Sequence, residues 1–380
     1  MKRVIPTLTD SSHGGQETLH RRHCKELGEI LKNPRETKVV VMPDFFLDRL
    51  IILNWNIAAF AEKLQEVASH KGGCLDGIAQ IDLKGGNAVN TASALTALDV
   101  KVTPIVCTNA FGLKLMKIHL ANDNIDFSHV KIFDRPSTTT AIEVKTEQGR
   151  ANIMLRDVGA LADFGPQHLD DDDFQTIEEA DFVCIFNWAG TRNFGTKLAR
   201  AVFSHTKMRG KGRTYYDTAD PTPNKQQIPN LIRSILESKQ LDMLSVNENE
   251  AICYASHLNR KEETFEDLPV EERAKESARL LASRYSARID LHATNFSATF
   301  TGKKEKIVPA FRVPVLRATG AGDAWNAGNI LGETYDLSDG ARLTLANAVA
   351  AYYVSDPSGT HATREKLSKF LLKMSKKDPS

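Results

Sequence analysis

The sequence lacks the features that mark several classes of protein. Its 380 residues carry a formal net charge of only +1, so the chain gives no electrostatic reason to expect binding to nucleic acid or to an anionic membrane surface. No apolar run approaches the length that spans a bilayer, and the basic start, Met1 to Arg3, is not followed by the apolar run of a signal peptide. We therefore expect a soluble cytoplasmic protein with neither nucleic acid nor a membrane among its partners.

Cysteine is scarce as well, and its distribution argues against two kinds of site. The chain has five cysteines, an odd number without a Cys-x-x-Cys pair, which speaks against a disulfide framework and against a zinc site. They are Cys24, Cys74, Cys107, Cys184 and Cys253, and we expect reduced, partly buried thiols. Hydrophobic residues at 41% and charged residues at 26% are ordinary for a globular protein, long enough here for one large α/β domain with an appendage or for two domains.

Strand and helix patterns alternate along most of the chain. Residues 1–37 are polar and are interpreted as an N-terminal extension, with a short helical face formed by Leu19, Leu27, Ile30 and Leu31. Buried strands are predicted at 38–42, 182–186, 214–217 and 243–246, with helices between them, notably at 270–285 and 340–354. This alternation predicts an α/β fold with a doubly wound, mostly parallel sheet, which binds ligands at the carboxyl ends of its strands. Residues 139–155 alternate with period two instead, which predicts exposed antiparallel strands.

The most informative motif is the small-residue turn from Thr319 to Gly322, which is followed by Asp323 and a helical pattern. Glycine lets a ligand approach the backbone closely, and the first N–H groups of a helix attract anions such as phosphate. A carboxylate at this position would repel bound phosphate, but it could take the proton from a hydroxyl that attacks the phosphate. A purely structural turn is the alternative. A dinucleotide-binding turn fits poorly, because such a turn should follow the first strand of a βαβ unit.

Three other groups of residues fit phosphoryl transfer, and each also has an ordinary structural explanation. Lys84 to Ala92 contains two glycines and two asparagines, Asn87 and Asn90, which offer hydrogen bonds to a polyhydroxylated ligand, although an Asn at a helix start is also a common N-cap. Asp48, shortly after the first strand, could accept two hydroxyl hydrogen bonds. Asn247 and Glu250 offer a carboxylate to hydrated magnesium, or form a capping box.

Together and in this order, these motifs resemble the ribokinase-like, PfkB-type carbohydrate kinase family. The resemblance covers about residues 38–375 as one kinase domain and implies ATP-dependent phosphorylation of a hydroxyl on a sugar, a related polyol or a nucleoside. It also implies a small β-sheet lid, which fits the segments at about 45–84 and 131–157, and it is compatible with a homodimer formed through that lid.

The resemblance implies a role for each matching residue. Asp323 matches the catalytic base, and Thr319, Gly320, Ala321 and Gly322 match the anion hole. Asp48, Gly85, Gly86, Asn87 and Asn90 match positions that bind the acceptor. Asn247, Thr294 and Asn347 are predicted to contact the nucleotide, and Glu250 is predicted to hold Mg²⁺ through water.

The chain also departs from the family pattern. Arg317 stands where the family usually has an acid that helps to hold a monovalent cation, so potassium activation is not expected. Residues 292–297 replace a nucleotide loop that normally has two glycines, which leaves the phosphate donor open. The aromatic residues Phe45, Phe46 and Trp55 keep a nucleoside acceptor open, and the altered loop keeps open a catalytically silent regulator that binds sugar or nucleotide.

Overall fold

Runs rich in apolar residues form several central strands of the main sheet. The computed structural model describes residues 11–147, 149–258 and 265–376. Its eight-stranded sheet has the order β14-β13-β12-β11-β10-β9-β1-β4. The strands are β1 (Lys38–Met42), β4 (Lys101–Pro104), β9 (Phe182–Phe186), β10 (Arg213–Asp217), β11 (Met243–Val246), β12 (Arg288–His292), β13 (Phe296–Thr301) and β14 (Lys304–Pro309). All five residues of β9 are buried, as expected when helices cover both faces of a sheet.

The pairing of these strands is mostly parallel. Strand β9 pairs in parallel with β1 and β10, and β11 pairs in parallel with β12. Strands β13 and β14 continue from β12 as antiparallel neighbours. The doubly wound, mostly parallel α/β sheet predicted from the sequence is therefore confirmed, with an antiparallel edge that the sequence pattern did not indicate.

The chain divides into two compact units. The first consists of the described parts of Met1–Lys38, Ser93–Lys101 and Asp242–Ser380. Its helices are α1 (Ser11–Ile30), α8 (Glu248–Leu258), α9 (Val270–Arg284), α10 (Ala321–Thr334), α11 (Asp339–Ser355) and α12 (Arg364–Met374). Helix α1 is longer than the short helix expected from the sequence. It packs on α12, where the Ser368 hydroxyl donates to the carbonyl of Gly28 at 2.8 Å, and it buries Leu27 and Leu31 but not Leu19.

The second unit consists of the described parts of Val39–Ala92 and Val102–Leu241. Its helices are α2 (Ile57–Ser69), α4 (Ala110–His119), α5 (Asp171–Glu179), α6 (Gly195–Arg209) and α7 (Ile228–Leu231), and α3 (Asn87–Ala97) begins in it. Short 3₁₀ turns cover Gly159–Asp163, Pro166–His168 and Thr222–Gln227, a π-helical turn covers Ile232–Leu236, and a small ladder joins β5 (Cys107–Thr108) to β6 (Lys131–Ile132). At the start of α5, Asp170 and Asp173 form a capping box.

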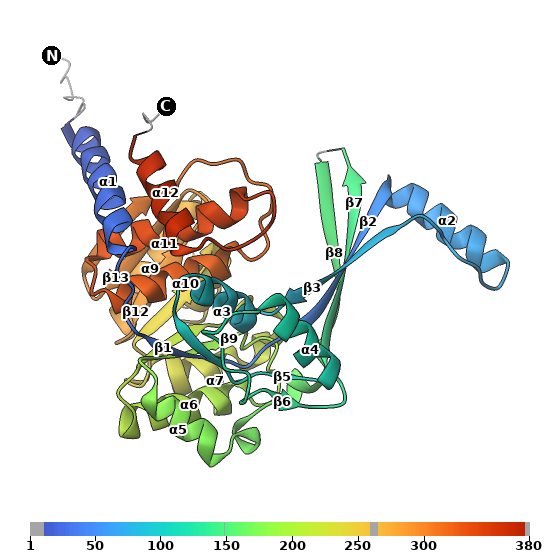
Figure 1. Cartoon of the computed structure of the whole chain (residues 1–380), viewed down its shortest axis with the longest axis horizontal. Helices are drawn as coiled ribbons and strands as arrows, with labels where there is room; N and C mark the ends of the chain where they lie inside the picture. The colour runs from blue at the N-terminus through green and yellow to red at the C-terminus, as the bar shows by residue number, and fades with distance from the viewer. Residues whose placement is uncertain (1–10, 148, 259–264, 377–380) are drawn as a thin grey trace. The chain divides into compact units, whose positions relative to one another are not determined.

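A separate four-stranded sheet in this unit is formed by the segments predicted as a lid, and it projects beyond the helices that surround the unit's main-sheet strands (Figure 1). It has the order β3-β2-β7-β8 and consists of β2 (Phe46–Asn56), β3 (Ala79–Gly85), β7 (Ser137–Thr146) and β8 (Gly149–Asp157). Strands β7 and β8 are antiparallel, as their period-two pattern predicted. Helix α2, which joins β2 to β3 and has no buried residue, was not expected. No helix in the described ranges is long and apolar enough to cross a bilayer.

Candidate active site

The turn before α10 has the backbone geometry that its sequence predicted. Gly320 caps the helix in the left-handed region, with φ 86° and ψ 0°, which glycine adopts without strain. The N–H of Ala321 is used inside the turn, donating to the carbonyl of Ala318 at 3.1 Å. The N–H groups of Gly322 and Asp323 follow in the first turn of α10, at the end of the helix that attracts anions. Asp323 itself is buried, with only 6% of its surface exposed. It lies at the positive end of the helix dipole.

The buried side of α10 carries a row of polar residues that hold the helix in place. The Ser245 hydroxyl on β11 donates to Asn326 Oδ1 at 2.7 Å, and Asn329 Nδ2 donates to Asp290 Oδ2 on β12 at 2.9 Å. Glu333, near the end of the helix, pairs with the guanidinium of Arg342 on α11 at 3.0 Å. These bonds run along most of α10 and fix its position, and with it the position of Asp323.

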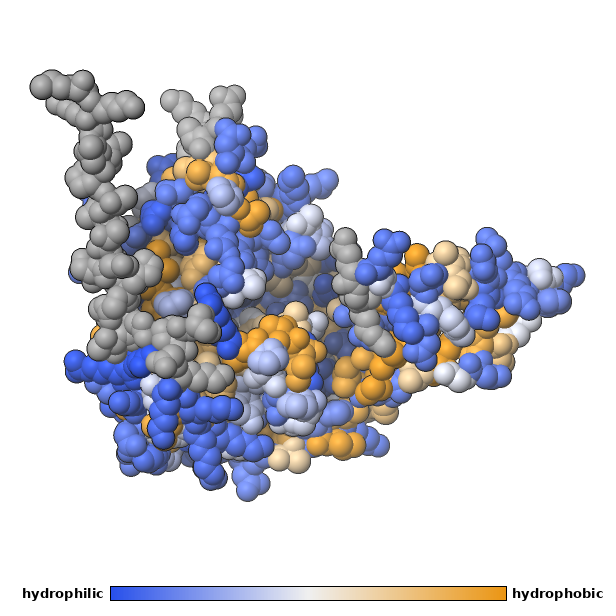
Figure 2. Space-filling model, turned by 90° about the horizontal axis from the view of Figure 1, so that it is seen from above, coloured by the Kyte–Doolittle hydropathy of each residue, from blue (hydrophilic) through white to orange (hydrophobic). Residues whose placement is uncertain are grey.

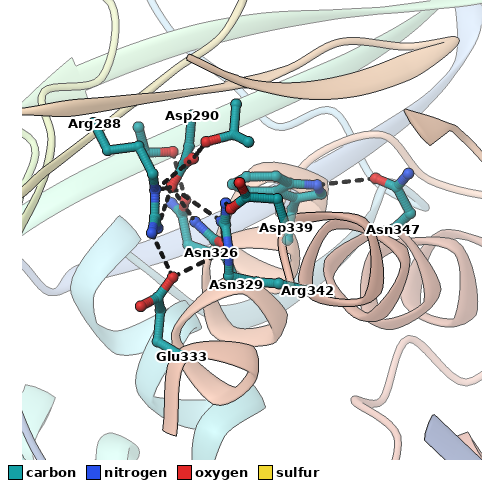
Figure 3. A network of polar contacts seen from close by, with 11 residues as sticks. Arg288, Asp290, Asn326, Asn329, Glu333, Asp339, Arg342 and Asn347 are labelled. Atoms are coloured by element: carbon teal, nitrogen blue, oxygen red, sulfur yellow. Dashed lines mark hydrogen bonds and ion pairs between the residues drawn. The ribbon is translucent and has the colours of Figure 1, made fainter. Parts of the chain in front are cut away.

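An ionic network closes around Asp290 (Figure 3). Arg288 and Arg342 both pair with Asp290 Oδ2, at 2.7 and 3.2 Å, and the Thr299 hydroxyl donates to its Oδ1 at 2.6 Å. Burial would raise the pKa of Asp290, but the two guanidinium groups and the hydrogen bonds from Arg288 and Thr299 hold it well below its usual range. Asp290 is therefore ionised, and its charge is fully paired inside the protein. The network is a structural support of α10.

Asn247 and Glu250 form a reciprocal capping box at the start of α8. The N–H of Glu250 donates to Asn247 Oδ1 at 3.0 Å, while the backbone N–H and the Nδ2 of Asn247 donate to the Glu250 carboxylate at 3.0 and 2.8 Å. A carboxylate oxygen can accept more than one hydrogen bond, and carboxylates are ligands that hydrated Mg²⁺ prefers. The described residues contain no cluster of three or more His, Cys, Asp or Glu that could cage a metal. The residues fit the predicted water-mediated role.

The segment at 292–297 forms a tight turn between β12 and β13. The N–H of Ala293 donates to the carbonyl of Phe296 at 2.9 Å, and the N–H of Thr294 donates to Glu248 Oε1 at 3.1 Å. The ring of His292 lies against the anion-hole turn, because a Cβ added to Gly322 would come within 3.2 Å of its Cε1. The exposed side chain of Thr294 remains a candidate contact to the nucleotide.

Asn347 on α11 is only 5% exposed, and both ends of its amide have protein partners. Its Oδ1 accepts from the Trp325 indole at 3.0 Å, and its Nδ2 donates to the carbonyl of Pro309 at 3.1 Å. In the described structure Asn347 therefore joins α10, α11 and the end of β14. A contact to the nucleotide base stays a prediction.

Two glycines shape the acceptor turn in the second unit. Gly86 has φ 97°, and a Cβ on it would lie 2.9 Å from the carbonyl oxygen of Asp44. A Cβ on Gly85 would lie 2.0 Å from Asp48 Oδ2, so the carboxylate of Asp48 packs directly on the glycine backbone. The predicted acceptor residues Asp48, Gly85 and Gly86 are thus in contact, and Asn87 begins α3 directly after them.

Asp44, which the sequence did not single out, organises this turn. Its carboxylate accepts the backbone N–H groups of Asn87 and Ala88, each at 2.9 Å, and the Nδ2 of Asn187 at 2.8 Å. Asp44 is fully buried, and this burial raises its pKa, while the hydrogen bonds from Asn187 and from the start of α3 oppose the rise. Asp44 therefore caps α3 from a distance, through the backbone N–H groups of Asn87 and Ala88.

Asp48 lies at the base of the lid with an unsatisfied acceptor. Its Oδ1 is buried and has no hydrogen-bond partner among the described residues, while the carboxylate interacts with the Thr139 hydroxyl. Burial raises the pKa of Asp48 to about 6, with Thr139, Arg156 and Lys84 opposing the rise and Asp44 adding to it. A buried carboxylate oxygen without a donor is suited to a ligand hydroxyl.

The strand register places further residues on the lid face of Asp48. Asp48 pairs with Leu83 on β3 and with Thr139 on β7, and Thr139 pairs with Arg156 on β8, so their side chains share one face. The guanidinium of Arg156 lies 4.9 Å from the centre of the Phe46 ring. Asn90 Oδ1 accepts from Lys84 Nζ at 3.2 Å, which places Asn90 beside the same turn.

The comparison of sequences decides the family. Residues 83–366, more than half of the chain, match the pfkB family of carbohydrate kinases. The chain belongs to this PfkB carbohydrate kinase family. It is a phosphotransferase with an alcohol group as acceptor. No curated protein shows significant sequence similarity to it.

Solved structures support the same fold. Ribokinase from Arabidopsis thaliana, complexed with ribose and ATP, is 19% identical, covers 90% of this chain and 100% of its own, and superposes with a TM-score of 0.64. Adenosine kinase from Sinorhizobium meliloti is 14% identical, with coverage of 88% and 99% and a TM-score of 0.67. Ribokinase from Thermotoga maritima is 16% identical, with coverage of 89% and 99% and a TM-score of 0.62. These likenesses confirm the ribokinase-like fold predicted from the motifs.

Proposed function

We propose that this PfkB-family kinase transfers the γ-phosphoryl group of ATP to a hydroxyl of a sugar or related polyol, with Asp323 as the general base. The observation that carries the proposal is the position of Asp323. Its carboxylate stands in the first turn of α10, three residues after the left-handed Gly320 that opens the turn toward a ligand. An acid next to donors for phosphate suits proton removal from the attacking hydroxyl better than it suits phosphate binding.

In the proposed reaction, the acceptor is held by Asp48 and by the turn that contains Gly85, Gly86 and Asn87, with Asn90 beside it. Asp48 Oδ1 offers the buried acceptor for a sugar hydroxyl. Another hydroxyl oxygen attacks the γ-phosphorus, its proton passes to the Asp323 carboxylate, and the bond from the γ-phosphorus to the bridging oxygen of ADP breaks. The N–H groups of the turn from Thr319 to Gly322, apart from that of Ala321, and those of the helix start stabilise the charge on the transferring group.

Magnesium and the nucleotide fit the remaining residues. When bound, Mg²⁺ neutralises charge on the donor phosphates. Glu250, oriented by Asn247, would hold the ion through water. ATP as donor is supported by solved structures of the same fold, one of them with ATP and Mg²⁺. Thr294 and Asn347 are the proposed nucleotide contacts, and the cytoplasm, where ATP is available, is the proposed location.

The test is an ADP-release assay with pentoses, hexoses, inositols and nucleosides as acceptors, followed by Asp323→Asn with the best acceptor. The substitution keeps the size of the side chain but removes the base, so we expect kcat to fall by at least ~10²-fold with little change in acceptor binding. Asp336→Asn is the matched control, because Asp336 is an exposed acid just after the same helix.

The possible results separate the alternatives. A variant with near-normal kcat would remove Asp323 from the mechanism. A nucleoside as the best acceptor would favour the nucleoside kinase, and binding of sugar or nucleotide without turnover would favour the silent regulator.

We also propose that two copies associate through the lid. The lid exposes large apolar side chains, visible as hydrophobic surface on the projecting sheet in Figure 2, including Ile81 at 45% and Met154 at 47% exposure. Met154 lies on the same face of the sheet as Asp48. It pairs with Ala141, and Ala141 pairs with Leu50, which is two residues after Asp48 on β2 and therefore shares its face. Sedimentation should show a dimer, and Met154→Glu should shift it toward a monomer. A monomer at all concentrations would contradict this arrangement.

A further inference from the structure

Arg317 stands two residues before Thr319, where the predicted anion-hole turn begins, and it forms no ion pair with a carboxylate in the described ranges. Its Nη2 donates to the carbonyl of Pro357 at 3.2 Å, and its guanidinium lies 5.8 Å from the centre of the Tyr353 ring. The Nη1 atom is buried and has no hydrogen-bond partner in the part of the chain that the structure describes. No described carboxylate forms an ion pair with Arg317. A partly buried arginine normally has an acid or solvent as partner, because an uncompensated buried charge is costly.

The guanidinium fills a site formed by the loop after α11. A Cβ on Gly359 would lie 2.5 Å from Arg317 Nη1, and Gly359 has φ 70°, so the loop approaches the guanidinium more closely than a larger residue would allow. The neighbouring backbone is tied to the same region, because the N–H of Leu316 donates to the carbonyl of Val354 at 2.8 Å. Arg317 therefore joins the segment before the turn to the loop from Pro357 to Gly359.

Tyr353 carries this connection to the turn itself. The Tyr353 hydroxyl lies 2.8 Å from the position that a Cβ on Gly320 would occupy, so it packs against the left-handed residue of the anion hole. On its other side the ring stacks on His361, with centroids 4.6 Å apart. Burial raises the pKa of Tyr353, while the charges of Arg317 and Asp323 act on it in opposite directions. The hydroxyl thus lies within the electrostatic range of both residues.

We infer that Arg317 is a positioning residue, a tethered cation that fixes the anion-hole turn and whose charge is balanced when the phosphates of the donor occupy that turn. The inference rests on the proposed function. It explains why the guanidinium has backbone and aromatic contacts, yet no acidic partner among the residues that the structure describes. It also explains the glycine at position 359, which leaves the space that the guanidinium fills.

The test uses two variants. Arg317→Ala removes the guanidinium group and leaves space that a free guanidinium ion can fill, and Arg317→Lys keeps the charge but loses the planar group. We expect kcat of Arg317→Ala to fall about 10- to 100-fold, the range expected when a catalytic group is misplaced, and ADP binding to weaken. Millimolar guanidinium chloride, far below unfolding concentrations, should restore activity saturably. Arg317→Lys should recover only part of the activity and should not respond to guanidinium.

A control and a second measurement make the result decisive. Arg312→Ala, which removes an exposed arginine from the same connecting segment, should keep normal activity and ignore guanidinium. Hydrogen exchange of the amides at 316–323 should be faster in Arg317→Ala and slow again with guanidinium, a readout that needs no substrate. If the wild type phosphorylates no acceptor, the proposed function fails, and this exchange measurement still decides the role of Arg317.

Two outcomes would overturn the inference. One is normal kcat, ADP binding and amide exchange in Arg317→Ala. The other is a loss of kcat in Arg317→Ala that guanidinium does not reverse and that is accompanied by a lower melting temperature of the whole protein. That result would make Arg317 an ordinary stabilising residue.

Discussion

Asp48→Asn should make this protein more stable at neutral pH while it weakens acceptor binding. Asp48 is half-buried at the base of the lid, where its buried Oδ1 has no hydrogen-bond partner among the described residues. Burial is the largest influence on its pKa, which rises from 3.8 to about 6. Without an acceptor bound, the ionised side chain is therefore held at a cost in folding free energy. An uncharged amide of the same shape avoids that cost but has one acceptor oxygen in place of two.

The size and sign of the effect follow from the pKa. A rise from 3.8 to about 6 corresponds to about 3 kcal/mol, at about 1.36 kcal/mol per pKa unit. Because the folded pKa lies above the unfolded value, the folded chain binds more protons than the unfolded chain between about pH 4 and about pH 6. The stability contribution of Asp48 therefore falls as the pH rises through this window. Asp48→Asn should be more stable than the wild type by at most about 3 kcal/mol above about pH 7, and the two should converge near about pH 4.

Urea unfolding of both proteins across this pH range measures the difference. The matched control is Asp82→Asn on the same lid sheet. A hydrogen bond from Arg49 lowers the pKa of Asp82, so its contribution has the opposite sign and is lost as the pH falls. In the same samples, KM for the acceptor should rise in Asp48→Asn. A stability difference for Asp48→Asn that does not change with pH would refute the reasoning, since it would show that Asp48 keeps an ordinary pKa in the folded chain.

Three further predictions concern residues of the first unit. Glu250→Gln should raise the magnesium concentration needed for half-maximal activity, because the carboxylate charge helps to hold the hydrated ion; superimposable magnesium curves would leave Glu250 as a helix cap. Activity should be equal in sodium, potassium and large organic cation salts at matched ionic strength, because Arg317 already places a fixed cation against the carbonyl of Pro357; saturable potassium activation would contradict this. Arg342→Met should lower the free energy of unfolding by about 3–5 kcal/mol in denaturant titrations, because Asp290 and Glu333 lose a buried partner; unchanged stability would show that the network does not hold α10.

The sequence predicted the central strands because their composition matches their environment. Strands such as β1 and β9 are continuous apolar runs, and both are buried. Strand β12 was missed for the opposite reason, since Arg288, Asp290 and His292 make it look exposed. Asp290 is nevertheless fully buried, because Arg342 and Asn329 supply charges and hydrogen bonds from far along the chain. A pattern within a short window cannot show partners of this kind.

The candidate site residues also include some that local sequence patterns could predict and some that they could not. The turn at 319–323 could be predicted because glycine at a left-handed position before a helix is a local requirement, which Gly320 meets. The role of Asp44 could not be predicted, because its partners Asn87 and Asn187 lie far from it in sequence. Its only sequence signal is an acid directly after the first strand and Pro43. Asn187 gives a weaker signal. Its backbone has φ 50°, a conformation that Asn tolerates better than most residues, but an asparagine in the sequence does not by itself indicate this conformation.

Helix α10 shows most clearly where periodicity misleads. Asp323, Asn326, Asn329 and Glu333 recur at spacings of three and four, so they share one face, and a polar face of this kind normally points to solvent. In the structure this face is buried, because Ser245, Asp290 and Arg342 satisfy it. A helix held only by apolar contacts can slide by small steps, since such contacts have little directional preference. Hydrogen bonds and ion pairs have narrow geometry, so any shift of α10 would break several at once. The polar face therefore fixes the Asp323 carboxylate relative to β11, β12 and α11, at the accuracy that proton transfer requires.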